Sequence, residues 1–253
     1  MEELTRTLPA WTYTSAEFYA AERERIFRRS WLVLGHMSQV AEPGDYVSMV
    51  VAGEPLMAIR GDDGELRAFS NVCRHRASRV VDGAGNCGKA LRCPYHGWTY
   101  GLDGRLLAVP EKTGFPGFDR SANGLWELHC EVAAGFVFVS MADEPEPLDQ
   151  YLGDAFFERL APYRPERLVL TQSGHERLEY NWKVSIDNYL EGYHIPVGHP
   201  SLLRLLDYRN YLVETTDTKV SVARSPIRDK ASKVWRERLY QRTVRPMPGL
   251  PED

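Results

Sequence analysis

The sequence predicts an α+β fold arranged as two domains. Short segments rich in β-branched and aromatic residues, separated by Gly- and Asp-containing turns, fill the chain from Trp31 to Met141. A helical pattern precedes them, and a second follows an acidic, proline-bearing break at 142–148. With 253 residues, of which 43% are hydrophobic and 26% charged, the chain is long enough to bury a sizeable core in each domain.

The first predicted element is an amphipathic helix from about Ser15 to Arg29, with Ser15 as its N-cap. Short strands follow, with hairpin turns at Asp62-Asp63-Gly64 and at Asp103-Gly104. The predicted strands cover residues 31–34, 45–51, 55–60, 66–70 and 131–141.

Beyond the break at 142–148, which we interpret as a linker, residues 168–180 are predicted to form a strand that leads into a helix. A basic helix is predicted from about Asp229 to Gln241. Its surroundings favour a solvated helix face, with docking of an acidic electron donor as the alternative. The basic residues of this stretch are Arg224, Arg228, Lys230, Lys233, Arg236, Arg238, Arg242 and Arg245.

Two pairs of metal-ligating residues stand in two predicted loops, Cys73-Arg74-His75 and Cys93-Pro94-Tyr95-His96. Two thiolates and two imidazoles suit zinc, or a [2Fe-2S] cluster in which histidines replace two cysteines on one iron. Structural zinc sites usually pair their cysteines as Cys-x-x-Cys, whereas each loop here supplies one cysteine and one histidine. The spacing therefore favours the cluster over zinc.

A second group follows in the predicted helix, where Glu191 and His194 are one helical turn apart. Pro196 and Gly198 are expected to end that helix, so that His199 turns back towards His194. Two imidazoles and a carboxylate with open positions form the facial triad of non-haem Fe(II) enzymes. Taken alone, paired histidines near a helix end are as often capping or packing residues.

Together these strings resemble a known family. NVCRHRA and RCPYHGWTYGLDGRL resemble the Rieske domain of ring-hydroxylating oxygenases, and NYLEGYH with a histidine five positions later is similar to their iron-binding signature. The resemblance implies the α, or oxygenase, subunit of a Rieske non-haem iron oxygenase. Its [2Fe-2S] ligands would be Cys73, His75, Cys93 and His96, and its mononuclear Fe(II) ligands His194 and His199.

The resemblance also implies a domain plan. A helix at 1–36 would pack on the catalytic domain, an all-β Rieske domain would span 37–141, and residues 149–253 would form the N-terminal part of a helix-grip (START-like) catalytic domain. The chain therefore looks truncated. No carboxylate matches the third iron ligand of the family, because Asp207, Glu214 and Asp217 lie in different contexts. The chain by itself is expected to lack a stable mononuclear iron site.

In the family, the residue at the position of Glu191 bridges two metal centres across a subunit boundary, which implies a homotrimer. Glutamate there favours the carnitine/choline monooxygenase-like branch, although aromatic substrates remain open. Asp187 and Asn188 either support this site or act as capping or surface residues.

The four cysteines bear on which Rieske lineage the chain resembles. Respiratory Rieske proteins have two further cysteines, where this chain has Ser78 and Tyr95. The chain is therefore unlike that lineage, and Cys87 and Cys130 are predicted to be unbridged, buried thiols.

By this resemblance, the protein uses O2 and electrons from NAD(P)H, received through a flavin-containing reductase or a ferredoxin, to hydroxylate, dihydroxylate or oxidatively demethylate a small organic substrate. The alternative is a Rieske electron-transfer or vestigial protein without oxygenase activity. A net charge of −4 argues against nucleic acid as partner. The absence of a long apolar run and of a signal peptide predicts a cytoplasmic protein without a membrane anchor.

Overall fold

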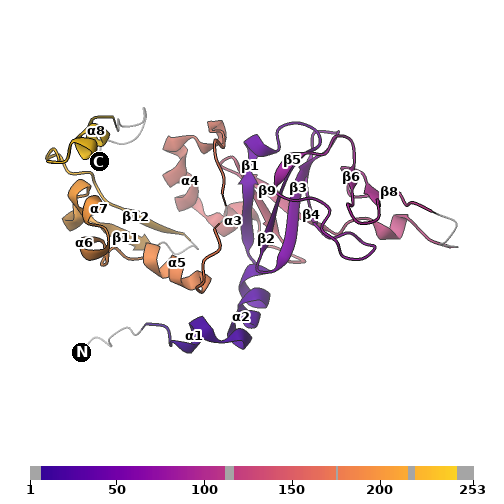
Figure 1. Cartoon of the computed structure of the whole chain (residues 1–253), viewed down its shortest axis with the longest axis horizontal. Helices are drawn as coiled ribbons and strands as arrows, with labels where there is room; N and C mark the ends of the chain where they lie inside the picture. The colour runs from indigo at the N-terminus through magenta and orange to yellow at the C-terminus, as the bar shows by residue number, and fades with distance from the viewer. Residues whose placement is uncertain (1–6, 112–116, 175, 216–219, 244–253) are drawn as a thin grey trace. The chain divides into compact units, whose positions relative to one another are not determined.

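The computed structural model describes residues 7–111, 117–174, 176–215 and 220–243 (Figure 1). The chain divides into two compact units. The first unit comprises Ala20–Gln150 with Arg164–Gly174, and the second comprises Tyr151–Tyr163 with the described residues of Met1–Tyr19 and His175–Asp253. Both helices and sheets are present, which confirms the predicted α+β class. No helix in the described part of the chain combines the length and apolar character that a bilayer crossing requires.

The first unit is built on a seven-stranded antiparallel sheet with the strand order β1-β10-β9-β4-β3-β2-β5. Its two predicted hairpin turns are confirmed in this unit. Gly64 has φ +80° between β3 (Glu54–Arg60) and β4 (Leu66–Ser70). Gly104 has φ +78° between β7 (Thr99–Tyr100) and β8 (Leu106–Ala108), and glycine adopts such a conformation at little cost. The strands of the sheet are β1 (Trp31–His36), β2 (Asp45–Val51), β3 (Glu54–Arg60), β4 (Leu66–Ser70), β5 (Ala84–Asn86), β9 (Glu127–Ala133) and β10 (Phe136–Ser140).

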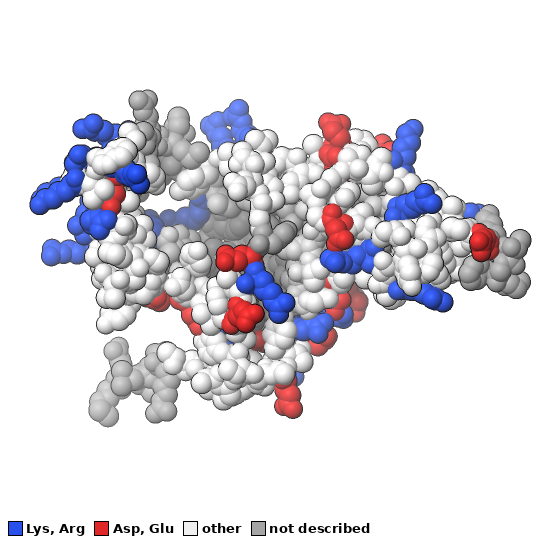
Figure 2. Space-filling model, in the orientation of Figure 1, with Lys and Arg blue, Asp and Glu red and all other residues white. Residues whose placement is uncertain are grey.

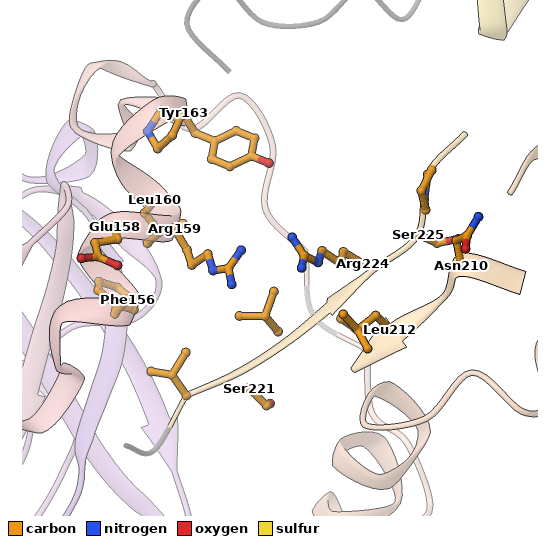
Figure 3. Close-up of a pocket in the computed structure, with 15 residues that line it drawn as sticks. Phe156, Glu158, Arg159, Leu160, Tyr163, Asn210, Leu212, Ser221, Arg224 and Ser225 are labelled. Carbon is orange, nitrogen blue, oxygen red and sulfur yellow. The ribbon is translucent and has the colours of Figure 1, made fainter. Parts of the chain in front are cut away.

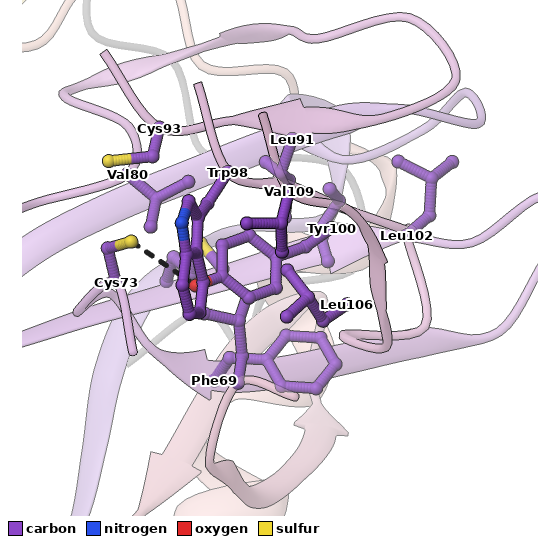
Figure 4. Close-up of a cluster of buried hydrophobic side chains, with 13 residues drawn as sticks. Phe69, Cys73, Val80, Leu91, Cys93, Trp98, Tyr100, Leu102, Leu106 and Val109 are labelled. Carbon is purple, nitrogen blue, oxygen red and sulfur yellow. Dashed lines mark hydrogen bonds between the residues drawn. The ribbon is translucent and has the colours of Figure 1, made fainter. Parts of the chain in front are cut away.

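A smaller three-stranded sheet carries the second Cys/His loop. It consists of β6 (Leu91–Arg92), β7 (Thr99–Tyr100) and β8 (Leu106–Ala108). A buried core joins it to the large sheet, and this core includes Phe69, Leu91, Trp98 and Tyr100 (Figure 4). A second core, around Leu34, Val47 and Val137, lies within the large sheet itself. Each core side chain of this size contributes about 1.5–3 kcal/mol by burial.

The single closing strand predicted at 131–141 is wrong, because the chain folds there as the hairpin of β9 and β10. Ala134 and Gly135 form its two-residue turn, and both have positive φ angles, of 48° and 79°. Such a turn usually carries Asn-Gly or Asp-Gly, so an Ala-Gly pair inside an apolar run gave no turn signal.

The N-terminal helix is divided rather than continuous. It comprises α1 (Trp11–Thr14), α2 (Ala16–Glu22) and a π-helical turn at Arg23–Phe27. Ser15 is confirmed as a cap, since its hydroxyl oxygen accepts a hydrogen bond from the Phe18 N–H at 3.1 Å. The hydroxyl of Tyr13 donates to Asp187 at 2.5 Å within the second unit.

The second unit contains a series of short helices and a β11–β12 hairpin. The strand predicted at 168–180 is wrong, because the described residues of that stretch have no strand pairing. The Leu170 N–H instead donates to the Ser38 hydroxyl at 3.1 Å, within the first unit. The elements after β10 are α3 (Leu148–Leu152), α4 (Asp154–Leu160), α5 (Trp182–Tyr189), α6 (Ile195–Gly198), α7 (Pro200–Leu205), β11 (Leu212–Thr215), β12 (Ser221–Arg224) and α8 (Trp235–Thr243).

Candidate metal centres

The two Cys/His loops are nearly identical turns. In the first, the Ala77 N–H donates to the Cys73 carbonyl at 3.0 Å and the Cys73 N–H to the Ser78 carbonyl at 2.8 Å. In the second, Gly97 and Cys93 make the corresponding bonds, Gly97 N–H to Cys93 C=O at 3.0 Å and Cys93 N–H to Trp98 C=O at 2.8 Å. Two loops of the same hydrogen-bonding pattern thus each present one cysteine and one histidine.

The loops bring like ligands together. The side chains of Cys73 and Cys93 are both buried and lie at one edge of the core in Figure 4. The rings of His75 and His96 lie edge to face, with centroids 4.6 Å apart. A thiol pair beside an imidazole pair is the donor set of a [2Fe-2S] cluster with two cysteines on one iron and two histidines on the other.

The hydrogen-bonding state of these ligands also fits such a cluster. Nδ1 of His75 is buried and has no hydrogen-bond partner among the described residues, although a buried polar atom normally has one. Burial lowers the pKa of His75, with the nearby His96 adding to the shift, so the neutral ring that can bind a metal is favoured. Burial raises the pKa of the Cys73 thiol, and metal binding would have to displace that proton.

Aromatic side chains support the loops from behind. Trp98 stacks on His75 with centroids 4.9 Å apart and an interplanar angle of 6°. The Tyr100 hydroxyl lies 3.2 Å from Cys73 Sγ and accepts a hydrogen bond from the Arg74 N–H at 3.0 Å. Sequence reasoning missed this role of Tyr100, which a period-2 reading of β7 could have revealed by placing its side chain inward.

The other two cysteines stand apart from this site and form no disulfide. Both are partly buried, and burial raises the pKa of Cys130 to about 12. The prediction that Cys87 and Cys130 are unbridged agrees with this state, whereas the prediction that both are buried is wrong because each is only partly covered.

In the second unit, Glu191, His194 and His199 come together by a different route from the one predicted. Helix α5 ends at Tyr189, before Glu191, and Pro196 lies in the first turn of α6 instead of ending a helix. The predicted shared helix is therefore wrong. A tight turn after α5 and the short helix α6 still place the rings of His194 and His199 with centroids 5.1 Å apart.

The Glu191 carboxylate forms hydrogen bonds with both the side chain and the backbone of His194. One of its oxygens contacts His194 Nδ1, and the other accepts the His194 backbone N–H at 3.2 Å. This pairing is the main cause that lowers the pKa of Glu191. Because Nδ1 is engaged, Nε2 of His194 is the nitrogen left for a metal, and a carboxylate on the far side makes an imidazole a better ligand. Across the described residues, no group of three or more His, Cys, Asp or Glu side chains is arranged to hold a single metal ion.

The residues that sequence analysis weighed for other roles have ordinary partners. Asp187 accepts from Tyr13, while Glu214 forms ion pairs with Arg159 at 2.9 Å and Arg224 at 3.0 Å. Asp207 accepts a hydrogen bond from the Asn210 side chain at 2.7 Å. Asp217 lies outside the described residues.

Part of the basic stretch near the C-terminal end is engaged within the second unit. Arg228 donates to the Leu206 carbonyl at 2.6 Å, and Arg238 donates to the carbonyls of Ser232 and Lys233. Figure 2 shows blue side chains over α8 and its surroundings, so this face is basic and solvated. Arg245 lies outside the described residues.

Two cavities in the second unit flank the β11–β12 hairpin. A pocket of about 240 Å³ lies against the end of α5 and is lined by Ile186, Tyr189, Leu190, Val213, Ser221 and Ala223. A larger cavity of about 1020 Å³ lies between α4 and the hairpin, and the Arg159 and Arg224 side chains point towards each other across it (Figure 3). Leu190, which lines the smaller pocket, directly precedes Glu191 in the sequence.

Taken together, the first unit presents the paired thiols and imidazoles of a Rieske-type iron–sulfur protein, and the second unit brings His194 and His199 together. Residues 30–119 match the family described as Rieske [2Fe-2S] domain, and residues 157–253 match the ring hydroxylating alpha subunit (catalytic domain). The chain therefore carries a Rieske domain and a segment of a ring-hydroxylating alpha-subunit catalytic domain, which confirms the resemblance found in the sequence.

Among its relatives is the glycine betaine monooxygenase oxygenase subunit of Chromohalobacter salexigens, which is 37% identical over 88% of this chain and 48% of the relative. The carnitine monooxygenase oxygenase subunit of Acinetobacter pittii is 39% identical over 77% of this chain and 53% of the relative. A crystal structure of the quaternary ammonium Rieske monooxygenase CntA with an inhibitor superimposes with a TM-score of 0.82 at 35% identity, over 88% of this chain and 62% of that one. The chain thus spans about half the length of the curated relatives it matches.

Proposed function

We propose that the protein is the oxygenase component of a Rieske monooxygenase that acts on a small quaternary ammonium compound. The carrying observation is the pairing of Glu191 with His194 Nδ1, beside His199, in a chain that also presents the paired thiols and imidazoles of a Rieske centre. Cys73, His75, Cys93 and His96 would hold the [2Fe-2S] cluster. His194 and His199 would supply two ligands to the mononuclear iron, and the described residues do not supply a third. When bound, this iron would supply the site for dioxygen and its reductive cleavage.

The protein's own residues have three tasks in this reaction. The buried Cys73 and Cys93 and the aromatic side chains behind them exclude water from the cluster site. Glu191 orients the His194 ring. We further propose that Glu191 accepts a second hydrogen bond from His96 of a neighbouring subunit, since His96 is exposed and available for such a contact. That bridge would carry electrons between the two centres and requires a ring of subunits, for which a homotrimer is our proposal.

The pocket at the end of α5 supports a small cationic substrate. Its volume is about 240 Å³, and no charged side chain lines it among the described residues. Tyr189 offers an aromatic ring to it, and such rings attract quaternary ammonium groups. The two relatives named above act, by their names, on glycine betaine and carnitine, which belong to this class.

A reductase-linked assay tests this proposal. The purified protein is combined with an NAD(P)H-dependent flavin reductase, which we propose as its electron donor, and O2 uptake is followed with carnitine, glycine betaine or biphenyl. Stimulation by a quaternary ammonium compound and none by biphenyl supports the proposal. A cluster that is reduced by the donor while no substrate stimulates O2 uptake would instead support the electron-transfer alternative.

The subunit bridge has a test of its own. A chain carrying His96→Ala and a chain carrying Glu191→Gln are each expected to be inactive, and mixed oligomers of the two are expected to regain part of the activity. Absence of any regain, with both variants folded and oligomeric, contradicts the bridge. Glu179→Gln, an exposed glutamate shortly before α5, is the matched control.

The domain limits and location follow from the same proposal. We place the Rieske domain at 31–141, because β1 (Trp31–His36) pairs with β10 in its sheet, so the predicted boundary at residue 37 lies too late. The catalytic portion lies at 149–253, and the described residues before Ala20 belong to its unit. Thiolates that must hold iron suit a reducing compartment, which supports a cytoplasmic location.

A further inference from the structure

Arg74, the residue between the two ligands of the first loop, is held at both ends. Its backbone N–H donates to the Tyr100 hydroxyl at 3.0 Å. Its guanidinium lies over the ring of Trp126, with Cζ 4.0 Å from the ring centroid. Trp126 directly precedes β9, so a residue far along the chain fixes where the charge of this loop lies.

The charge of Arg74 is not neutralised by a neighbouring acid. Within the described residues no carboxylate forms an ion pair with it, and its Nε is buried without a hydrogen-bond partner. Arg79, in the same loop, provides a contrast, because it pairs with Asp82 at 2.7 Å and its side chain is 53% exposed. Arg74 is therefore the half-buried, uncompensated cation of the cluster loop.

We propose that Arg74 raises the reduction potential of the Rieske cluster, and that Trp126 is the positioning residue that keeps its guanidinium beside the loop. The inference rests on the proposed function, in which this loop holds the [2Fe-2S] centre. Reduction transfers one electron from the donor protein to the cluster, so the net charge of the site becomes more negative by one. A fixed positive charge nearby stabilises that reduced state relative to the oxidised state.

The stack on Trp126 matters because it limits hydration of the guanidinium. A cation over an aromatic face is attracted by the ring and is partly shielded from water on that side. A unit charge roughly 10 Å from the cluster, acting through an effective dielectric constant of about 20, shifts the equilibrium between the oxidised and reduced cluster by about tenfold. A charge free to move into solvent has a much smaller effect, since surface charges are screened.

Redox titration of the intact protein, followed by electron paramagnetic resonance, tests this. Arg74→Gln is expected to disfavour reduction by about tenfold, which is about 59 mV for a one-electron couple. Arg74→Lys keeps the charge and should retain most of the wild-type potential. Trp126→Leu should lower the potential by less than Arg74→Gln, and Trp126→Phe, which preserves a ring, should restore it. Arg79→Gln is the matched control and should change the potential much less, because Arg79 is 53% exposed and solvent screens its charge.

Equal potentials for Arg74→Gln and Arg79→Gln would overturn the inference. The iron and acid-labile sulfide contents of each variant show whether its cluster has assembled. If Arg74→Gln does not assemble a cluster, the inference is tested by comparing the potentials of Trp126→Leu and Trp126→Phe. Equal potentials for these two variants also overturn the inference. A wild-type protein without labile sulfide would instead refute the proposed function.

Discussion

Replacement of Tyr100 by phenylalanine tests how the fold supports the cluster loop. Tyr100 is fully buried, and its hydroxyl both accepts the Arg74 N–H and lies 3.2 Å from Cys73 Sγ. Burial is the main cause that raises its pKa, so the group stays a neutral phenol and remains able to donate to a thiolate. Phenylalanine preserves the packing of the ring and removes only these hydrogen bonds.

The magnitude follows from those two bonds. A hydrogen bond contributes about 1 kcal/mol net, and leaving the Arg74 N–H without a partner costs about 1–3 kcal/mol more. We therefore expect Tyr100→Phe to lower the free energy of unfolding by about 2–4 kcal/mol. Urea unfolding followed by tryptophan fluorescence measures this as a lower transition midpoint at unchanged slope.

The control is Tyr46→Phe, because Tyr46 packs against the same core and no hydrogen bond of its hydroxyl is present among the described residues. Its unfolding midpoint should stay close to the wild-type value. If Tyr100→Phe is no less stable than Tyr46→Phe, the argument that Tyr100 secures the loop is refuted.

Three further predictions follow from the structure. Gly104→Ala should destabilise the protein by about 2–4 kcal/mol, because Gly104 has φ +78° and an added Cβ would lie 2.4 Å from Phe69; urea unfolding as stable as wild type would contradict this. Cys130 should resist alkylation in the native protein at neutral pH, since burial raises its pKa to about 12, and mass spectrometry showing rapid labelling would refute the assignment. The pairing with His194 lowers the pKa of Glu191, so this carboxylate stabilises the fold above its ordinary pKa and the contribution is lost as pH falls through the lowered value. Glu191→Gln should therefore be less stable than wild type at neutral pH and equally stable in acid, as measured by unfolding at each pH, and a difference that persists in acid would contradict the pairing.

The sequence predicted the strands of the first unit well because their turns carry strong local signals. The limits of β2 and β4 agree with the prediction, and the turn at Gly64 lies where Asp-Asp-Gly placed it. The hairpin of β9 and β10 was missed because Ala134 adopts a left-handed conformation, and alanine is not one of the residues that usually indicate such a turn. Local sequence propensity thus determined the element limits where its signal was strong, and strand pairing in the folded sheet determined them where that signal was weak.

The candidate site shows the same division. Spacing singled out the residues of both Cys/His loops, because ligand chemistry restricts the residue types, whereas the Glu191 group needed the family resemblance as well. Spacing predicted one helix through Glu191 and His194, whereas α5 ends before both. The supporting contacts of Tyr100, Trp98 and Trp126 arise from elements distant in sequence, and no local pattern reports such contacts.

The measurement that tests the central claim most directly is the iron and acid-labile sulfide content of anaerobically purified protein, combined with electron paramagnetic resonance of the reduced, 15N-histidine-labelled sample. We predict about two irons and two sulfides per chain at the cluster, with couplings from two histidine nitrogens, one of which is lost in any cluster that assembles in His75→Ala. Any iron above that level reports on the second site. A tightly bound zinc ion with no labile sulfide and no resonance after reduction would contradict it.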